Sequence, residues 1–169
     1  MKYSSLISPY LEYGIIAWGH THSSYLDRIL LLQKKALRII CQTSWKAHTD
    51  ILFYENNILK INELFNHYLG QFMYKLEYKE LPLIFYDMFK KNNAIHKYPT
   101  RHSNEFHLPR TRTILTHSTF TSAGPKFWNK LDNNLKSAPS IASFKKRLKL
   151  VLLNYYKESA ANQHQILFT

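Results

Sequence analysis

Positively charged side chains gather at three places in this sequence, and their types and spacing suit the binding of phosphate groups. The first set recurs at helical spacing and comprises Arg28, Lys34, Lys35 and Arg38. The second lies among Thr, Ser and His residues and comprises Arg101, Arg110 and Arg112. The third places four cations in five positions: Lys145, Lys146, Arg147 and Lys149. Cations along a helix match a polyanionic backbone, and arginines on an extended segment grip phosphates through paired hydrogen bonds.

Each cluster also has an ordinary structural interpretation. The helical and carboxy-terminal sets suit a solvated helix face equally well. The arginines of the second set could instead pin the loop to helix ends or carboxylates. A nuclear-import signal is a weaker third interpretation of Lys145 to Lys149. The overall charge favours binding, because 23 Lys and Arg against 11 Asp and Glu give +12 and a pI near 9.7. Residues 101–169 hold 11 basic and 3 acidic side chains, so the second part carries most of the excess. We therefore expect RNA, an RNA–DNA hybrid or duplex DNA as the partner.

Catalytic patterns are missing from the sequence. Two-metal phosphoryl transfer needs clustered carboxylates, and no Asp-Asp pair occurs in the chain. There is also no G-x-S-x-G elbow, P-loop or H-E-x-x-H motif. The pairs His20 with His22 and His102 with His107 lack acidic or thiolate company at ligand spacing, and Cys41 is the single cysteine. We expect a chain without catalytic activity of its own, without a cofactor and without a bound metal.

The three tryptophans divide into two groups. Trp18 and Trp128 lie within apolar stripes and are expected in the core, whereas Trp45 lies in a polar turn. For Trp45, core packing and stacking on nucleic-acid bases both remain open.

The elements that must position these residues are expected to be helices, because the chain has only four glycines and six prolines. Apolar spacing predicts long helices at 24–41 and 62–78 and short ones at 8–19, 50–55 and 83–91. Gly124-Pro125 is expected to open a helix at 126–135, and Ser140 to cap one at 141–156. Periodicity is lost between 92 and 123, where we expect an extended or short β-hairpin connection.

The predicted fold class is therefore mainly α, with helical regions at 1–91 and 124–158, the connection at 92–123 and a frayed tail at 159–169. No apolar run approaches the roughly 18 residues that cross a bilayer, and Pro9 and Glu12 interrupt the start too early for a signal peptide. We expect an intracellular protein of nucleus or cytoplasm, not secreted and not bound to a membrane. An apolar pattern begins directly after Met1, which suggests a fragment of a longer unit.

Three stretches carry a family resemblance. The first is YSSLISPYLEYGIIAWG at 3–19 with LQKKALRII at 32–40, the second YPTR at 98–101 with LPRTRT at 108–113, and the third GPKFWNKL at 124–131 with FKKRL at 144–148. In this order they resemble the region downstream of the palm in reverse transcriptases of non-LTR, LINE-type, jockey-like retrotransposons.

The resemblance covers nearly the whole chain. It implies that residues 1–91 form a helical thumb-like bundle and that a small helical lobe follows, together holding primer and template. The family's palm, with its catalytic Asp pair, its fingers and its endonuclease would lie outside this chain, and a palm domain would be a further partner. The alternatives are a free-standing basic helical module of the host that binds nucleic acid, and an interaction or structural protein.

Overall fold

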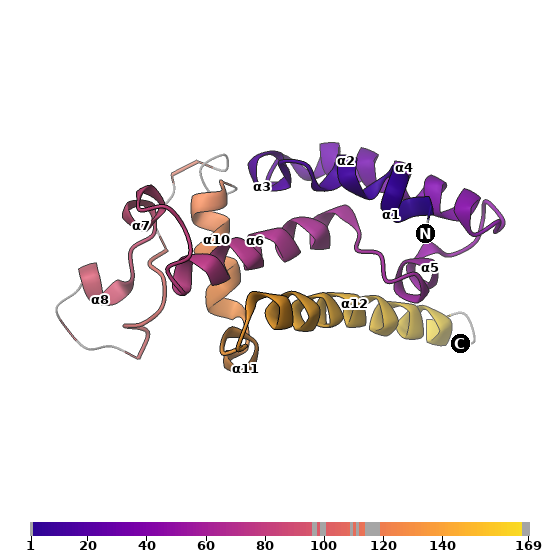
Figure 1. Ribbon diagram of the computed structural model, residues 1–169. Helices are drawn as coiled ribbons and strands as arrows, with labels where there is room; N and C mark the ends of the chain where they lie inside the picture. Colours follow the sequence, from indigo (N-terminus) through magenta and orange to yellow (C-terminus); the bar gives the residue numbers. More distant parts are fainter. Residues whose placement is uncertain are drawn as a thin grey trace. The chain divides into compact units, whose positions relative to one another are not determined.

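The computed structural model describes residues 2–95, 98, 101–108, 110, 112, 113 and 119–166, with side chains as far as Tyr156. This part of the chain is all-helical and contains no strand. Its helices are α1 (Lys2–Leu6), α2 (Ser8–Glu12), α3 (Ile15–Trp18), α4 (Ser23–Ile40), α5 (Thr49–Glu55), α6 (Ile61–Glu77), α7 (Ile84–Met88), α8 (Asn92–Ile95), α10 (Phe120–Lys130), α11 (Asn133–Lys136) and α12 (Ile141–Ile166) (Figure 1). The mainly helical prediction is confirmed.

The structure divides into two compact units. Unit 1 comprises residues 1–67 and 146–169, and unit 2 comprises residues 68–145, so α6 and α12 each contribute residues to both. The segment boundaries that we expected at residues 91, 123 and 158 stay a prediction.

The beginning of unit 1 is three short helices rather than the one predicted over 8–19. Pro9 lies in the first turn of α2, as expected, but α2 ends at Glu12. Gly14 follows with φ of 62°, a left-handed conformation that favours glycine and that separates α2 from α3. The Trp18 indole donates a hydrogen bond to the Tyr13 carbonyl at 2.8 Å, which ties α3 back to this break.

Helix α4 follows its predicted boundaries and buries its predicted face. Leu26, Gln33 and Leu37 are buried, while the other members of the apolar stripe are half-buried. A buried amide on such a face needs hydrogen-bond partners. The Gln33 side chain donates to the Tyr3 hydroxyl at 2.7 Å and to the Leu59 carbonyl at 3.3 Å, and it accepts from the Ile61 N–H at 2.9 Å.

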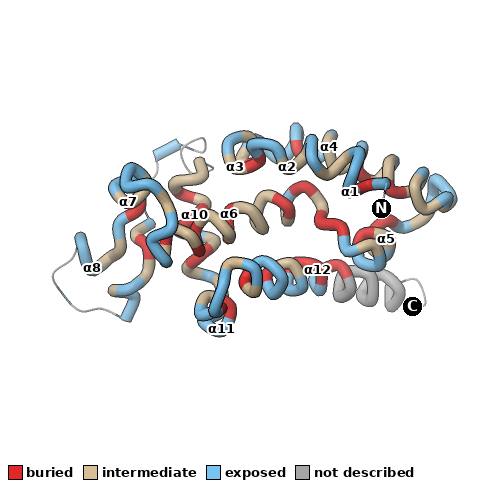
Figure 2. The backbone as a smooth tube through the Cα atoms, in the orientation of Figure 1, coloured by how far each residue is buried: buried red, intermediate tan, exposed pale blue. Residues whose placement is uncertain are grey.

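The connection between α5 and α6 is buried although it is not helical. Ile58 and Leu59 lie in the core, and Figure 2 shows buried positions along this segment. Gln33 satisfies the backbone of Leu59 and Ile61, and the Tyr156 hydroxyl of α12 accepts the Lys60 N–H at 2.9 Å. Burial, followed by the nearby Glu63 carboxylate, raises the pKa of Tyr156 well above its ordinary value, so its phenol stays neutral.

The core of unit 2 is aromatic and centres on the second half of α6. Tyr74 packs against Phe144 of α12 with ring centroids 4.8 Å apart and against Trp128 of α10 at 6.5 Å. The buried Tyr74 hydroxyl donates to the Ala138 carbonyl at 2.7 Å, and burial raises the pKa of this phenol. A Cβ on Gly124 would lie 2.8 Å from the Met73 sulfur, so glycine lets α10 approach α6 closely.

Other predicted helices also differ from the observed ones, and that at 83–91 is limited to α7. Gly124 and Pro125 lie inside α10, which begins at Phe120, rather than before it. Pro125 is fully buried, and its packing in the core offsets the backbone hydrogen bond that its ring removes. Helix α12 is capped by Ser140, whose hydroxyl accepts the Ser143 N–H at 3.2 Å, but it continues to Ile166. Its buried face contains Leu153 and Tyr156, whereas Val151 and Tyr155 are exposed.

The expected hairpin at 92–123 is not observed in the described residues, where one antiparallel bridge joins Lys91 and Phe106. Around it, the Asn92 N–H donates to the Glu105 carbonyl at 3.0 Å and the His107 N–H to the Lys90 carbonyl at 2.8 Å. Asn129 of α10 clamps Phe106 by accepting from its N–H at 3.1 Å and donating to its carbonyl at 2.8 Å. Residues 96, 97, 99, 100, 109, 111 and 114–118 of the predicted connection lie outside the described residues.

The Gln33 contacts generate a stability prediction. Gln33→Met keeps a side chain of similar length but leaves the buried Ile61 N–H and Leu59 carbonyl without this partner. Each unsatisfied buried group costs about 1 to 3 kcal/mol, so urea unfolding should show a loss of roughly 2 to 4 kcal/mol. Lys35→Met, on the exposed side of the same helix, is the control and should change stability by less than about 0.5 kcal/mol. Equal stability of the two variants would show that the amide is dispensable.

Trp128 provides a second prediction, because its ring is buried against Tyr74 and Phe144. Trp128→Ala should lower the free energy of unfolding by about 3 to 5 kcal/mol, measured by thermal or urea melting. Trp45→Ala, at an exposed ring, is the matched control and should leave the midpoint nearly unchanged. The anchor role would be refuted if Trp128→Ala kept its midpoint and lost only affinity for nucleic acid.

Candidate nucleic-acid interface

The outer face of α4 carries two of the predicted phosphate-binding cations. Arg28 and Lys35 are seven residues apart, which places them on the same side of the helix two turns apart, and both are exposed. Gln33 lies about 140° to 160° around the helix from them, so its buried hydrogen bonds fix this outward direction. Leu32 and Ile39, also exposed, lie on this face. The face is therefore basic and apolar at once.

The other two cations of this set have different surroundings. Lys34 and Arg38 are half-buried and lie on the flank of α4. The Arg38 guanidinium donates from Nε and Nη2 to the Ala47 carbonyl at 3.2 and 3.0 Å. Arg38 thus holds the α4–α5 loop against the last turn of α4, and a phosphate contact by this residue stays a prediction.

That loop carries two further residues that could contact a ligand. Trp45 is 76% exposed, and the Lys46 ammonium lies 5.2 Å from the centroid of its ring. The sequence left open whether Trp45 packs in the core or stacks on bases. Its exposure shows that the ring does not lie in the core. Lys46 did not belong to the predicted set. The sequence feature that could have identified Lys46 is its position directly after a tryptophan in a short polar turn.

Three members of the dense carboxy-terminal set, Lys145, Lys146 and Lys149, share one side of α12, and Arg147 points away from it. Consecutive helical residues point about 100° apart, so Arg147 points about 200° around α12 from Lys145. Lys145, Lys146 and Arg147 are exposed, and Lys149 is half-buried. Lys149 lies three residues after Lys146 and four after Lys145, the spacing of neighbours on a helix surface, so a phosphate contact by this set stays a prediction.

The arginines of the second set, Arg101, Arg110 and Arg112, are all exposed. Arg101 lies in the turn at 101–104. Pro109 and Thr111, which flank Arg110, lie outside the described residues, so the extended phosphate grip expected from this motif stays a prediction.

Three of the four paired histidines have local hydrogen-bond partners. His102 Nδ1 lies 2.8 Å from Glu105 Oε1, and His107 Nδ1 lies 3.2 Å from Asn92 Oδ1. His22 Nδ1 accepts the Ser24 N–H at 3.3 Å at the start of α4. Within the described residues, no group of three or more His, Cys, Asp or Glu side chains is arranged to hold a metal ion.

A partly buried lysine of unit 2 lies outside the predicted sets. The Lys136 ammonium donates to the Asn129 carbonyl at 3.3 Å. Burial lowers the pKa of Lys136, partly opposed by the carboxylates of Glu105, Glu77 and Asp132. This lysine is a structural cation rather than a surface contact.

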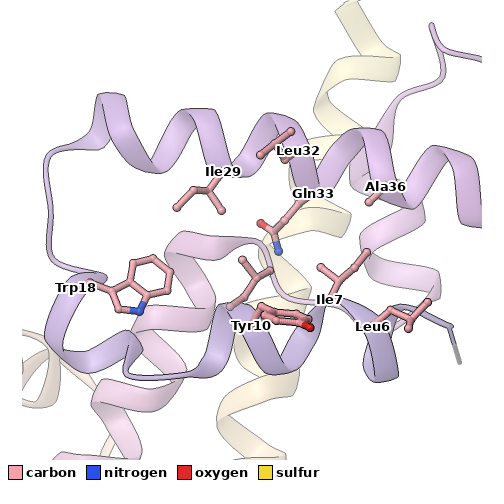
Figure 3. Close-up of a pocket in the computed structure, with 9 residues that line it drawn as sticks. Leu6, Ile7, Tyr10, Trp18, Ile29, Leu32, Gln33 and Ala36 are labelled. Carbon is pink, nitrogen blue, oxygen red and sulfur yellow. The ribbon is translucent and has the colours of Figure 1, made fainter.

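An apolar groove of about 600 Å³ lies between the first helices and α4. Figure 3 shows Leu6, Tyr10 and Trp18 on one side, with Ile29, Leu32 and Ala36 of α4 opposite. The polar groups of Gln33 and Trp18 already have partners in the chain, because Gln33 donates to the Tyr3 hydroxyl and the Trp18 indole donates to the Tyr13 carbonyl. The groove therefore suits apolar groups.

Comparison of the chain with protein-family models, with curated proteins and with solved structures finds no match. Among the described helices, none is both long and apolar enough to cross a membrane. The function must therefore be argued from the residues themselves.

Proposed function

We propose that this chain binds the backbone of RNA or DNA through the outer face of α4, and that it descends from the thumb and carboxy-terminal region of a non-LTR retrotransposon reverse transcriptase. The observation that carries the proposal is the exposed pair Arg28 and Lys35 on one side of α4 in a chain of net charge +12. A polyanion gains affinity at such a face by releasing its condensed counterions. The contacts fix position on the nucleic acid without reading its sequence.

Two of the motifs that resemble the family lie in elements suited to this role. The stretches at 3–19 and 32–40 fall in α1 to α4, which build the basic face and its support. In the stretch at 124–131, the residues Gly124, Trp128 and Asn129 make packing contacts or hydrogen bonds within unit 2. The resemblance and the charge thus support the same function by different routes.

A salt titration tests this proposal. The affinity for a 20-base-pair DNA should fall steeply between about 50 and 200 mM salt. Arg28→Ala/Lys35→Ala should reduce the slope of log affinity against log salt by about 0.9 for each lost contact, or roughly 1.8. The control, Lys126→Ala/Lys130→Ala, removes the same charge from exposed positions of α10. A flat salt dependence, or equal slopes for the two double variants, would refute an α4 interface.

Absence of polymerase activity is part of the proposal, because the family's catalytic carboxylate pair has no counterpart in this sequence. Purified chain should incorporate no nucleotide on a primed RNA or DNA template with Mg²⁺ or Mn²⁺. An active reverse transcriptase on the same template serves as the control. Reproducible, template-dependent primer extension by several preparations would contradict this expectation.

The second candidate is a free-standing interaction module, and the groove between α1–α3 and α4 favours it. Lys2, Arg28 and Lys35 lie on the helices that bound the groove, and all are exposed. Its apolar floor and basic surroundings suit an amphipathic helix with acidic flanks. Under this alternative, Leu32→Glu would abolish binding of such a peptide. The chain would show no affinity for nucleic acid even at low salt.

A further inference from the structure

The loop between α4 and α5 presents an exposed tryptophan on an ordered turn. Trp45 and Lys46 occupy the two central positions of a turn closed by the Ala47 N–H, which donates to the Ser44 carbonyl at 3.0 Å. The Ser44 hydroxyl accepts the Lys46 N–H at 3.4 Å. With 76% of Trp45 exposed, a large apolar ring stays in water without a packing partner of its size. Such an exposed aromatic ring is typical of binding surfaces.

The turn is fixed to α4 at both of its ends. Gln42, two residues after the end of α4, adopts the left-handed conformation with φ of 52°, and the Thr43 N–H donates to the Arg38 carbonyl at 3.0 Å. The Arg38 guanidinium then holds the Ala47 carbonyl with two hydrogen bonds. Because these contacts order the backbone in advance, a ligand that uses Trp45 pays less entropy to bind.

The charge around the ring indicates the chemistry of the ligand. The Lys46 ammonium lies over the Trp45 ring at 5.2 Å, and no acidic residue occurs between Asp27 and Asp50. One face of the indole is thus associated with a cation, and stacking requires only the other face. A planar ring beside a cation matches a nucleotide, whose base stacks while its phosphate pairs with the ammonium.

We propose that Trp45 is a stacking platform for an unpaired base and that Lys46 holds the adjoining phosphate. This rests on the proposed function, since α4 supplies the backbone contacts, and it specifies the ligand as single-stranded RNA or DNA. Bases of a continuous duplex are stacked on one another and cannot reach the indole. An unpaired strand offers both a free base and a phosphate.

The test measures affinity of the full chain for a labelled single-stranded 12-mer and for a blunt duplex hairpin by fluorescence anisotropy. Trp45→Ala should weaken single-strand binding about 5- to 150-fold, the range for one stacked base, and change duplex binding by less than about twofold. Trp45→Phe should retain part of the affinity, whereas Trp45→Leu, which is apolar but not planar, should behave like Trp45→Ala. Quenching of indole fluorescence by the single strand should decrease in Trp45→Phe.

A second variant separates failure of this proposal from failure of the proposed function. Lys35→Ala, which lies outside the turn, should weaken single-strand and duplex binding alike. If Lys35→Ala has this effect while Trp45→Ala has none, or weakens both ligands equally, stacking is refuted and backbone binding stands. If neither variant affects either ligand, both proposals fail. Full affinity of Trp45→Leu for the single strand would identify Trp45 as an apolar protein contact instead.

Discussion

Unit 1 depends on how the buried connection between α5 and α6 satisfies its backbone. Ile58 and Leu59 are drawn into the core, but the segment is not helical, so its N–H and C=O groups cannot pair with one another in regular fashion. Gln33 and Tyr156 supply the partners from α4 and α12. Two polar side chains on otherwise apolar faces thus join elements that are far apart in sequence. Replacing either one by an apolar residue of similar shape would leave backbone groups in the core unpaired.

The same contacts determine which side chains of α4 and of the following loop are exposed on unit 1. Because Gln33 must face the connection, α4 cannot rotate about its axis, and Arg28 and Lys35 must face away from the core. Arg38, at the end of the helix, holds the next loop and so sets the position of Trp45. The surface proposed to bind nucleic acid is therefore a consequence of interior hydrogen bonds. A change at Gln33 would act on binding indirectly, by releasing the rotation of α4, as well as on stability.

Sequence periodicity predicted the long helices α4 and α6 and the Ser140 cap because each depends on local spacing. The prediction was wrong where tertiary packing determines whether a residue lies inside a helix. Gly124 and Pro125 are ordinarily helix breakers, yet they lie within α10, since a small residue is needed against Met73. Two residues beyond the ends of α4, α5 and α6 stand Gln42, Asn57 and Lys79, each with positive φ, where glycine would have signalled the stop. In the candidate site, charge singled out Arg28 and Lys35, and the structure shows that both are exposed, but the loop contacts of Arg38 and the exposure of Trp45 required the fold.

The mixture of cations and apolar side chains on α4 also bears on which nucleic acid the proposed interface would bind. A smooth duplex presents phosphates and sugars outward and would leave Leu32 and Ile39 in water, with no gain from burying them. An unpaired strand can turn its bases toward such groups while its phosphates reach Arg28 and Lys35. Excluding water from the apolar positions would lower the local dielectric constant and strengthen the neighbouring charge pairs. For the proposed interface, this composition favours a flexible strand over a rigid duplex independently of Trp45.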